Sequence, residues 1–287
     1  MLLYEEVIIL KKIFYLLLGI VGCNTISVSA METNLNTYFY NYNGVEITET
    51  EYSNLESLGF TDNEIMYMSQ TEFNDNKDLK GEVVSEITTY VKVINGIEQV
   101  VSKEEYEAPD MSIFGMQAGY IETGAKKMTT RIISTNGRYR YKVDLEWKSM
   151  PKVRSYDILG IGIENNVSIY SNVYFQQNYC YSSGRCSSST TSSKKSTSTG
   201  GAASFKIPSS TLLTSLSSYL YFNVDKKSSM TITELNAYGD YSHATKTISE
   251  SNAKNYSITR AGIVLQDSIA SYYDAISYAQ AVWTGSW

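Results

Sequence analysis

Apolar and polar residues alternate most regularly along the chain between residues 128 and 148. The segment contains Asn136-Gly137, a dipeptide typical of type I′ hairpin turns. From Tyr139 to Trp147 every second residue is apolar, and the residues between them are charged. This period of two predicts a strand with one face in a core and the other in solvent. A two-residue turn also brings Arg131 opposite Lys142.

The rest of the chain beyond residue 80 shows further strand patterns. A hairpin around Asn95-Gly96 is predicted over residues 87–101, and later strands over residues 158–163, 167–181, 203–207, 218–224 and 230–238. Twenty-five Tyr against eight Phe also favour sheets, because tyrosine suits pleated, half-exposed surfaces. The predicted fold class is therefore mainly β, an antiparallel β-sandwich or barrel-like domain.

Three features of this region depart from simple alternation. Residues 182–201 are almost entirely Ser, Thr, Gly and Lys, which predicts a long exposed loop. Gly160 and Gly162 within an apolar strand indicate a bulge or the close approach of another backbone. Residues 267–283 suit either a helix or a closing strand.

A small helical hairpin is predicted before the β-rich region. Thr48-x-x-Glu51 and Thr61-x-x-Glu64 both have capping-box spacing, in which a hydroxyl and a carboxylate satisfy backbone N–H groups at a helix start. Gly59 is placed to end the first of the two helices.

Residues 1–30 have the pattern of a signal peptide. Two lysines precede the apolar run of residues 13–21, which is too short to span a bilayer. Two processing sites remain open. Cleavage after Val28-Ser29-Ala30 would secrete the protein from Met31, whereas Ile20-Val21-Gly22-Cys23 is similar to a lipobox, and processing there would leave Cys23 acylated and the protein lipid-anchored at the cell membrane.

Cysteine content agrees with export. Apart from Cys23, the chain has only Cys180 and Cys186, with Gly184 between them to turn the loop. An even pair at short spacing in an exported protein predicts a local disulfide. The alternative is a pair of free, buried thiols, and a zinc site would need more Cys or His ligands than the chain offers.

Charge divides the exported part into two blocks. Residues 31–110 carry seventeen acidic and four basic residues, a net charge of −13, whereas residues 111–287 carry eleven acidic and eighteen basic residues, a net charge of +7. We therefore predict an acidic N-terminal region, with a helical hairpin and a β-hairpin, followed by a basic β-sandwich domain. Opposite charges favour docking of the two.

A basic domain outside the cell suggests anionic partners. Candidates are an anionic cell-wall polymer or a lipid surface, and the alternative is ordinary solvated charge without a partner. Nucleic acid is not expected in this compartment. One hypothesis is that the acidic region masks the basic domain until it is cut or displaced near Ala108-Pro109-Asp110.

Few residues suggest chemistry. His243 is the single histidine, and nearby Asp240 could orient its ring, but no Gly-x-Ser-x-Gly nucleophile accompanies them. Asp144, Asp157 and Asp240 could converge as glycosidase acids do, although their spacing does not favour it. Calcium loops and phosphate-binding glycine loops are absent from the sequence. We predict no catalytic residue, no metal site and no cofactor.

Three stretches of sequence carry a family resemblance. Residues 156–162, 173–177 and 237–244 resemble exported β-rich proteins of Gram-positive, spore-forming bacteria. The resemblance implies an extracellular setting, and it implies neither an activity nor functional residues.

Three functional classes follow from the sequence. The first is a secreted or envelope-associated, non-catalytic β-sandwich protein that binds an anionic surface or cell-wall ligand. The second is a membrane-active, pore-forming protein, although residues 187–198 lack the alternating apolar residues of a lipid-facing hairpin. The third is a polysaccharide hydrolase.

Overall fold

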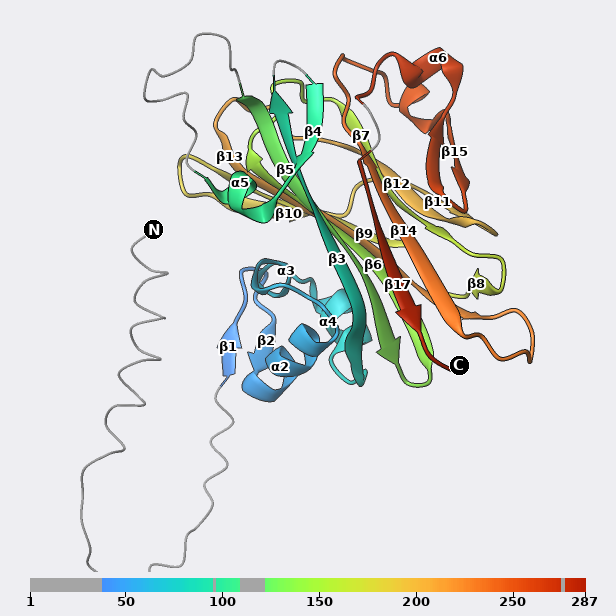
Figure 1. Ribbon diagram of the computed structural model, residues 1–287. Helices are drawn as coiled ribbons and strands as arrows, with labels where there is room; N and C mark the ends of the chain where they lie inside the picture. The colour runs from blue at the N-terminus through green and yellow to red at the C-terminus, as the bar shows by residue number, and fades with distance from the viewer. Residues whose placement is uncertain (1–37, 95–96, 109–121, 275–276) are drawn as a thin grey trace, which may run out of the picture. The chain divides into compact units, whose positions relative to one another are not determined.

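Two antiparallel sheets packed face to face form the centre of the protein (Figure 1). The computed structural model describes residues 38–94, 97–108, 122–274 and 277–287. The predicted signal peptide, both of its processing sites and Cys23 lie outside the described residues. Among the helices of the described ranges, none combines the length and apolar character needed to cross a membrane.

The first sheet has eight strands in the order β10-β9-β13-β6-β5-β3-β4, with β8 paired to β13. Their bounds are β3 Gly81–Ile94, β4 Ile97–Val101, β5 Glu122–Thr135, β6 Arg138–Ser149, β8 Val167–Ile169, β9 Tyr174–Tyr181, β10 Cys186–Ser189 and β13 Leu213–Lys226. A short helix, α5 Lys103–Glu107, follows β4.

The second sheet has five strands in the order β11-β12-β7-β14-β17. Their bounds are β7 Tyr156–Ile163, β11 Ser193–Thr197, β12 Gly200–Lys206, β14 Glu234–Ser242 and β17 Ser277–Thr284. Every pairing in both sheets is antiparallel. The predicted fold class of a mainly β, antiparallel sandwich is therefore confirmed, and the tail is a closing strand as well as a short helix.

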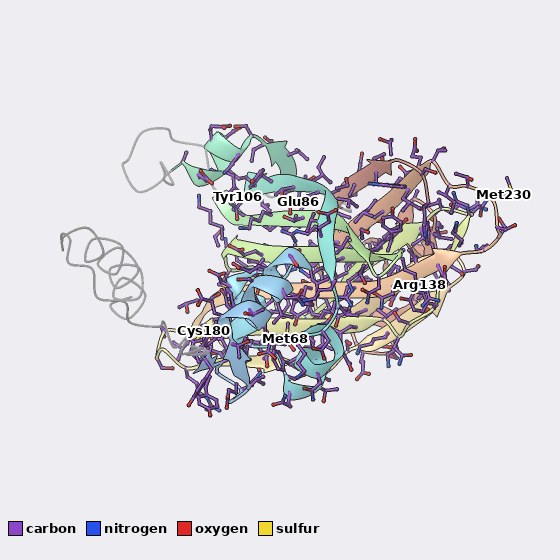
Figure 2. All side chains as sticks on the ribbon, turned by 90° about the horizontal axis from the view of Figure 1, so that it is seen from below. Met68, Glu86, Tyr106, Arg138, Cys180 and Met230 are labelled. Carbon is purple, nitrogen blue, oxygen red and sulfur yellow. A yellow bond between two sulfur atoms is a disulfide. The ribbon has the colours of Figure 1, made fainter. Side chains whose placement is uncertain are left out.

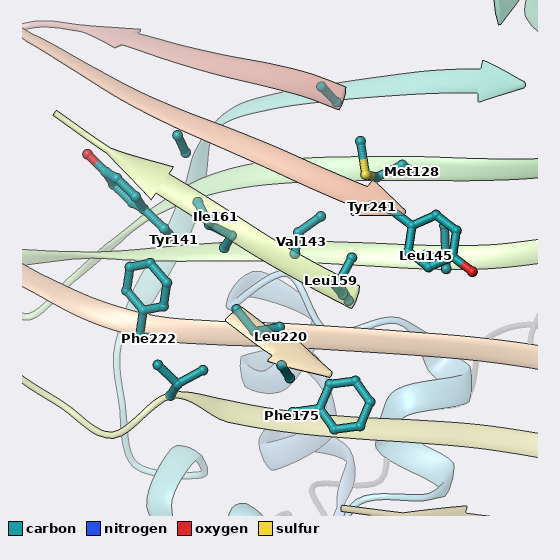
Figure 3. Packing of buried hydrophobic residues seen from close by; sticks show 14 of the residues in the cluster. Met128, Tyr141, Val143, Leu145, Leu159, Ile161, Phe175, Leu220, Phe222 and Tyr241 are labelled. Carbon is teal, nitrogen blue, oxygen red and sulfur yellow. The ribbon is translucent and has the colours of Figure 1, made fainter. Parts of the chain in front are cut away.

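The hairpin predicted at residues 128–148 is confirmed in detail. Asn136 and Gly137 both have positive φ angles, of 51° and 78°, as a type I′ turn requires. The resulting register places Arg131 opposite Lys142, as predicted. The alternate apolar residues of β6 point into the core between the sheets, where they meet the inner faces of β7, β13 and β14 (Figure 3).

The predicted solvent face of β6 is exposed at Arg138, Glu146 and Lys148, but the prediction was wrong for the middle of that face. Arg140 and Lys142 are 2% and 0% exposed, because the segment of residues 38–80 covers the outer face of the first sheet. We call this the helical segment. It contains β1 Tyr38–Tyr40, β2 Glu46–Thr48, α2 Glu49–Ser57, α3 Asp62–Met66 and α4 Gln70–Asn76.

Local sequence signals define the helical segment. Both predicted capping boxes are present, at Thr48 with Glu51 and at Thr61 with Glu64. Gly59 follows the first helix with φ of +76°, and a Cβ there would lie 3.0 Å from the side chain of Arg131. The small residue therefore lets the turn lie flat on the sheet.

A C-terminal layer covers the outer face of the second sheet. It consists of η2 Asn252–Lys254, β15 Tyr256–Thr259, β16 Gly262–Leu265 and α6 Asp267–Ala270. A Cβ at Gly162 would lie 2.5 Å from the carbonyl oxygen of Arg260, so the hairpin turn of this layer rests directly on the strand. The close backbone approach predicted from Gly160 and Gly162 is confirmed.

Two other expectations need correction. The boundary between residues 31–110 and 111–287 divides the first sheet, because β3 pairs along its length with β5 and lies between β4 and β5. A cut near Ala108 would therefore leave a strand of the acidic region inside the sheet. Residues 182–201 are not one long loop: they contain β10 and β11, two short edge strands in different sheets.

Candidate functional site

An open cleft of about 460 Å³ lies where the chain crosses from β10 in the first sheet to β11 in the second. We call it the edge cleft. Strands β9 and β10 form one wall, and β11 and β12 form the other. Its lining residues are Tyr156, Gln177, Tyr179, Ser189, Thr191, Ser192, Ser193, Ser204, Phe205, Lys206, Ile207, Pro208, Ser209 and Glu250.

Gln177 is the most informative side chain of the edge cleft. It is 3% exposed, and its Nε2 donates a hydrogen bond of 3.2 Å to the carbonyl oxygen of Lys206. Because a carbonyl only accepts, this contact fixes which end of the amide is nitrogen. Oε1 is then buried with no hydrogen-bond partner among the described residues. Buried polar atoms in folded proteins are nearly always paired.

Two charged side chains line the edge cleft, Glu250 and Lys206, and they differ in whether a described residue neutralises their charge. Glu250 is exposed and pairs with Lys254 at 2.8 Å. The hydrogen bond from Lys254, together with its positive charge, lowers the pKa of Glu250. Lys206 is also exposed, and it forms no ion pair within the described ranges. One positive charge in the cleft is therefore uncompensated.

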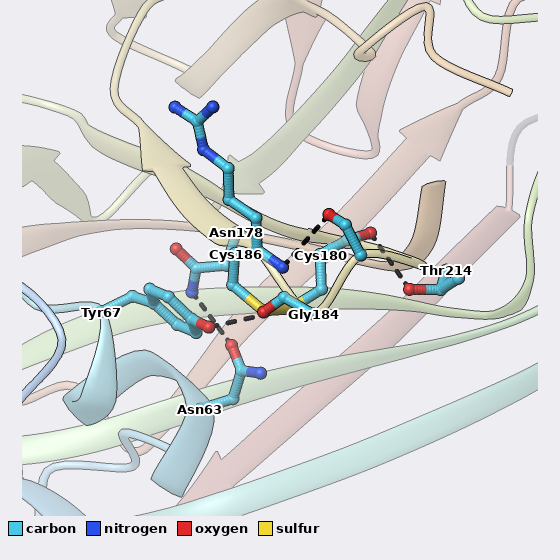
Figure 4. The surroundings of a disulfide bond; sticks show 9 residues. Asn63, Tyr67, Asn178, Cys180, Gly184, Cys186 and Thr214 are labelled. Atoms are coloured by element: carbon cyan, nitrogen blue, oxygen red, sulfur yellow. Dashed lines mark hydrogen bonds between the residues drawn. A yellow bond between two sulfur atoms is a disulfide. The ribbon is translucent and has the colours of Figure 1, made fainter. Parts of the chain in front are cut away.

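The predicted disulfide forms one end of a cleft wall. Cys180 and Cys186 are bonded, and they are also directly opposed in the β9–β10 ladder (Figure 4). Among the described strands, β10 pairs only with β9, and its last residue, Ser189, lines the edge cleft. The Tyr67 hydroxyl lies 3.6 Å from Cys180 Sγ, so the helical segment reaches the same place. In the view of Figure 2, Cys180 and Met68 are labelled towards one end of the molecule and Arg138 and Met230 towards the other.

A second polar cluster joins the two sheets around His243. Its ring Nδ1 lies 3.0 Å from Oδ2 of Asp157, which is fully buried. The same carboxylate accepts hydrogen bonds from the Tyr241 hydroxyl and the Ala244 amide. The backbone amide of His243 donates to Asp274 at 2.8 Å. The imidazole is therefore held by a partner that is distant in sequence, and not by Asp240.

The pKa of His243 reflects competing effects. Burial alone would lower it, but the charge of Asp157, its hydrogen bond and the charge of Asp274 together raise the pKa above 6.5. Lys126 pairs with Asp274 and with Glu98 in the same cluster, and its ammonium lies 5.2 Å from the ring centre of Trp147. The cluster binds strands of both sheets together, which gives it a structural role.

A third polar cluster lies between the helical segment and the first sheet. Both carboxylate oxygens of Glu64 accept hydrogen bonds of 2.9 Å from Lys142. Glu72 accepts hydrogen bonds from the hydroxyls of Tyr174 and Tyr219, at 2.8 Å and 2.9 Å. The predicted attraction between the acidic region and the basic strands is thus present as buried contacts.

Burial dominates the ionisation of this layer. It raises the pKa of Glu72 to about 8, and hydrogen bonds from the two tyrosines only partly oppose it. It lowers the pKa of Lys142, against the attraction of Glu64. Both side chains are 0% exposed. A ligand from solvent cannot reach them in this arrangement, so the layer is a packing interface.

The remaining candidate acids do not converge. Asp240 accepts a hydrogen bond from the Ile263 amide in the C-terminal layer, and burial raises its pKa to about 7. Asp144 pairs with Lys142 and Arg131 beneath the helical segment. Asp157 faces His243 instead. Within the described ranges, no group of three or more His, Cys, Asp or Glu side chains could hold a metal ion.

The sequence did not reveal the edge cleft. Gln177 is one of three consecutive polar residues, 176–178, in a predicted strand, and nothing in the sequence distinguishes it from its neighbours. Lys206 is one of many lysines. The connection between β10 and β11 reads as a featureless serine-rich loop. What brings these residues together is the crossing of the chain between sheets, which depends on long-range pairing.

The fold and cleft define a two-sheet antiparallel β protein with a polar site at the open edge of its sandwich. Neither the models of known protein families nor the curated proteins include a match to the chain. One similar solved structure is described as manganese lipoxygenase of Gaeumannomyces graminis with a partial zonadhesin of Komagataella pastoris. The match covers 72% of this chain and 89% of that chain, at 10% identity and a TM-score of 0.27. That TM-score carries no argument about function.

Proposed function

We propose that the chain is a secreted or envelope-associated, non-catalytic protein that binds a cell-wall ligand in the edge cleft. The observation that supports this most is the buried, unpaired Oε1 of Gln177 in the wall of an open cleft. A ligand that donates a hydrogen bond there would complete the pairing. The volume of about 460 Å³ is within the range of small-ligand sites.

The lining of the edge cleft suits a polyhydroxylated polymer. Serine and threonine hydroxyls donate and accept, as sugar hydroxyls do. Tyr156 and Tyr179 are half-buried rings on which the C–H face of a sugar can pack. The open edge of a sandwich also lets a chain continue past the site. A disulfide and the N-terminal targeting pattern both suit an extracellular setting.

A wall-binding assay tests the proposal. The full chain is incubated with purified Gram-positive cell wall, and the bound fraction is compared with that of Gln177→Leu. We expect the variant to bind at least about fivefold more weakly, because it loses the acceptor. Gln99→Leu, at an exposed position of β4 outside the cleft, is the matched control. Equal binding by Gln177→Leu and the unchanged protein would contradict the proposal that the ligand binds in the edge cleft.

Two parallel assays cover the alternative functions. Release of dye from liposomes without wall binding would replace the proposal with membrane activity. Turnover of a wall polysaccharide would replace it with hydrolysis, and the Asp157–His243 pair would then be the first place to test.

A further inference from the structure

We infer that the ligand of the edge cleft is an anionic polyol, a hydroxyl-rich chain that carries phosphate or carboxylate groups. The inference rests on the proposed function and narrows its ligand class. It follows from a buried hydrogen-bond acceptor, Gln177 Oε1, and an uncompensated cation, Lys206, that line the same cleft.

The buried acceptor requires a ligand with hydrogen-bond donors. Gln177 Oε1 is the one buried side-chain polar atom without a partner among the described lining residues. An amide oxygen carries partial negative charge, so it repels a bare anion and attracts a hydroxyl or N–H group. A lone ionised carboxylate has no donor and does not satisfy it. A polyol does.

The uncompensated cation requires a negative charge on the same ligand. Lys206 is exposed and makes no ion pair within the described part of the chain, while Glu250 is neutralised by Lys254. The 3.2 Å hydrogen bond from Gln177 to the backbone carbonyl of Lys206 joins β9 of the first sheet to β12 of the second, and both residues line the edge cleft. One ligand unit can therefore meet both.

The other residues that line the edge cleft are also compatible with an anionic polyol. Ser189, Ser192 and Ser193 line the cleft where the chain crosses from β10 to β11, and they add no charge. The rings of Tyr156 and Tyr179 offer apolar faces but no cation-binding carboxylate. A cationic ligand would have to pass Lys206 and displace Lys254 from Glu250. The charge layout thus favours an anion.

Four probes test the ligand class by calorimetric titration of the full chain. They are a glycerol phosphate oligomer, an oligogalacturonate, neutral maltohexaose and inorganic phosphate. We expect one of the anionic oligomers to bind at least about tenfold more tightly than maltohexaose, and more weakly at high salt. Inorganic phosphate, which lacks the hydroxyl-rich chain, should bind more weakly than the preferred oligomer. The preferred oligomer then distinguishes a phosphate source from a carboxylate source.

Matched variants separate this inference from the proposed function. Lys206→Gln should remove the tenfold preference and the salt dependence, whereas Lys227→Gln, an exposed lysine outside the cleft, should keep both. If maltohexaose binds as tightly as the anionic oligomers, or if Lys206→Gln changes nothing, the ligand is neutral and only this inference fails. If no oligomer shifts the NMR signals of the Gln177 side-chain amide, the proposed function fails as well.

Discussion

The ammonium group of Lys142 lies 2.9 Å from both carboxylate oxygens of Glu64, a residue 78 positions earlier in the chain. The contact joins the central strand β6 to the helical segment, and both side chains are almost fully buried. It explains why a strand that alternates apolar and charged residues has no solvent face at its centre. The helical segment supplies the counter-charge.

Removing either side chain of the Lys142–Glu64 pair should lower the free energy of unfolding. Lys142→Met leaves the Glu64 carboxylate buried without its cation, and we expect a loss of about 3–5 kcal/mol in the free energy of unfolding. The double variant Lys142→Met/Glu64→Gln should recover most of it. Urea unfolding measures both. The exposed pair Lys127–Glu146 is the control, and Lys127→Met should cost less than about 1 kcal/mol. Similar costs for the two lysines would contradict a buried pair.

Much of the fold could be predicted from sequence because its signals are local. Capping boxes at Thr48 and Thr61 and the turn at Asn136-Gly137 each depend on residues a few positions apart. The core face of β6 also follows from its period of two. These features need no knowledge of distant partners.

What could not be predicted depends on distant parts of the chain. Periodicity cannot show that the charged face of β6 is covered, because Glu64 comes from another layer. Likewise, Asp240 is near His243 in sequence, whereas Asp157 is its partner in space. The edge cleft needs the pairing of β10 and β11 with different sheets, and a serine-rich stretch contains no signal for that.

Glu72 should make stability depend on pH. Its pKa is raised from 4.5 to about 8 in the folded protein, so between these values the folded state holds one more proton than the unfolded state. The free energy of unfolding should therefore fall as pH rises from about 5 to 8, by up to about 1.4 kcal/mol per pH unit from this group. Glu72→Gln, which has no proton to lose, should remove that part of the fall.

Urea unfolding at several pH values measures this effect. The difference in stability between Glu72→Gln and the unchanged protein should grow steadily towards pH 8. Glu56→Gln, at an exposed position of α2, should follow the unchanged protein at every pH. If the free energy of unfolding of Glu72→Gln changed with pH in parallel with that of the unchanged protein, the carboxyl group of Glu72 would not be kept protonated by burial.

His243 can be titrated by NMR without assignment, because the chain has one histidine. Its midpoint should lie above 6.5, since Asp157 and Asp274 favour the charged ring more than burial disfavours it. The stability that this shift provides is full below about pH 6.5 and is lost as pH rises through the folded pKa. Asp157→Asn should lower the midpoint. Asp240→Asn should leave the midpoint of His243 unchanged. If Asp240→Asn lowered the midpoint and Asp157→Asn did not, Asp240 would be the partner of the imidazole, as its proximity in sequence suggests.

The disulfide should act on the edge cleft more than on the whole fold. Cys180 and Cys186 are six positions apart, so reduction frees only a short loop and should cost about 2–3 kcal/mol. Within the described part of the chain, however, β10 pairs with β9 alone, and the bond holds its first residue against β9. In Cys180→Ser/Cys186→Ser, hydrogen exchange should therefore rise at Ser187–Ser189 and remain slow in the central strand β13.

Because Ser189 lines the cleft, wall binding should weaken in the same variant while the melting temperature falls only a little. Faster exchange throughout β13 would mean instead that the bond stabilises the entire first sheet.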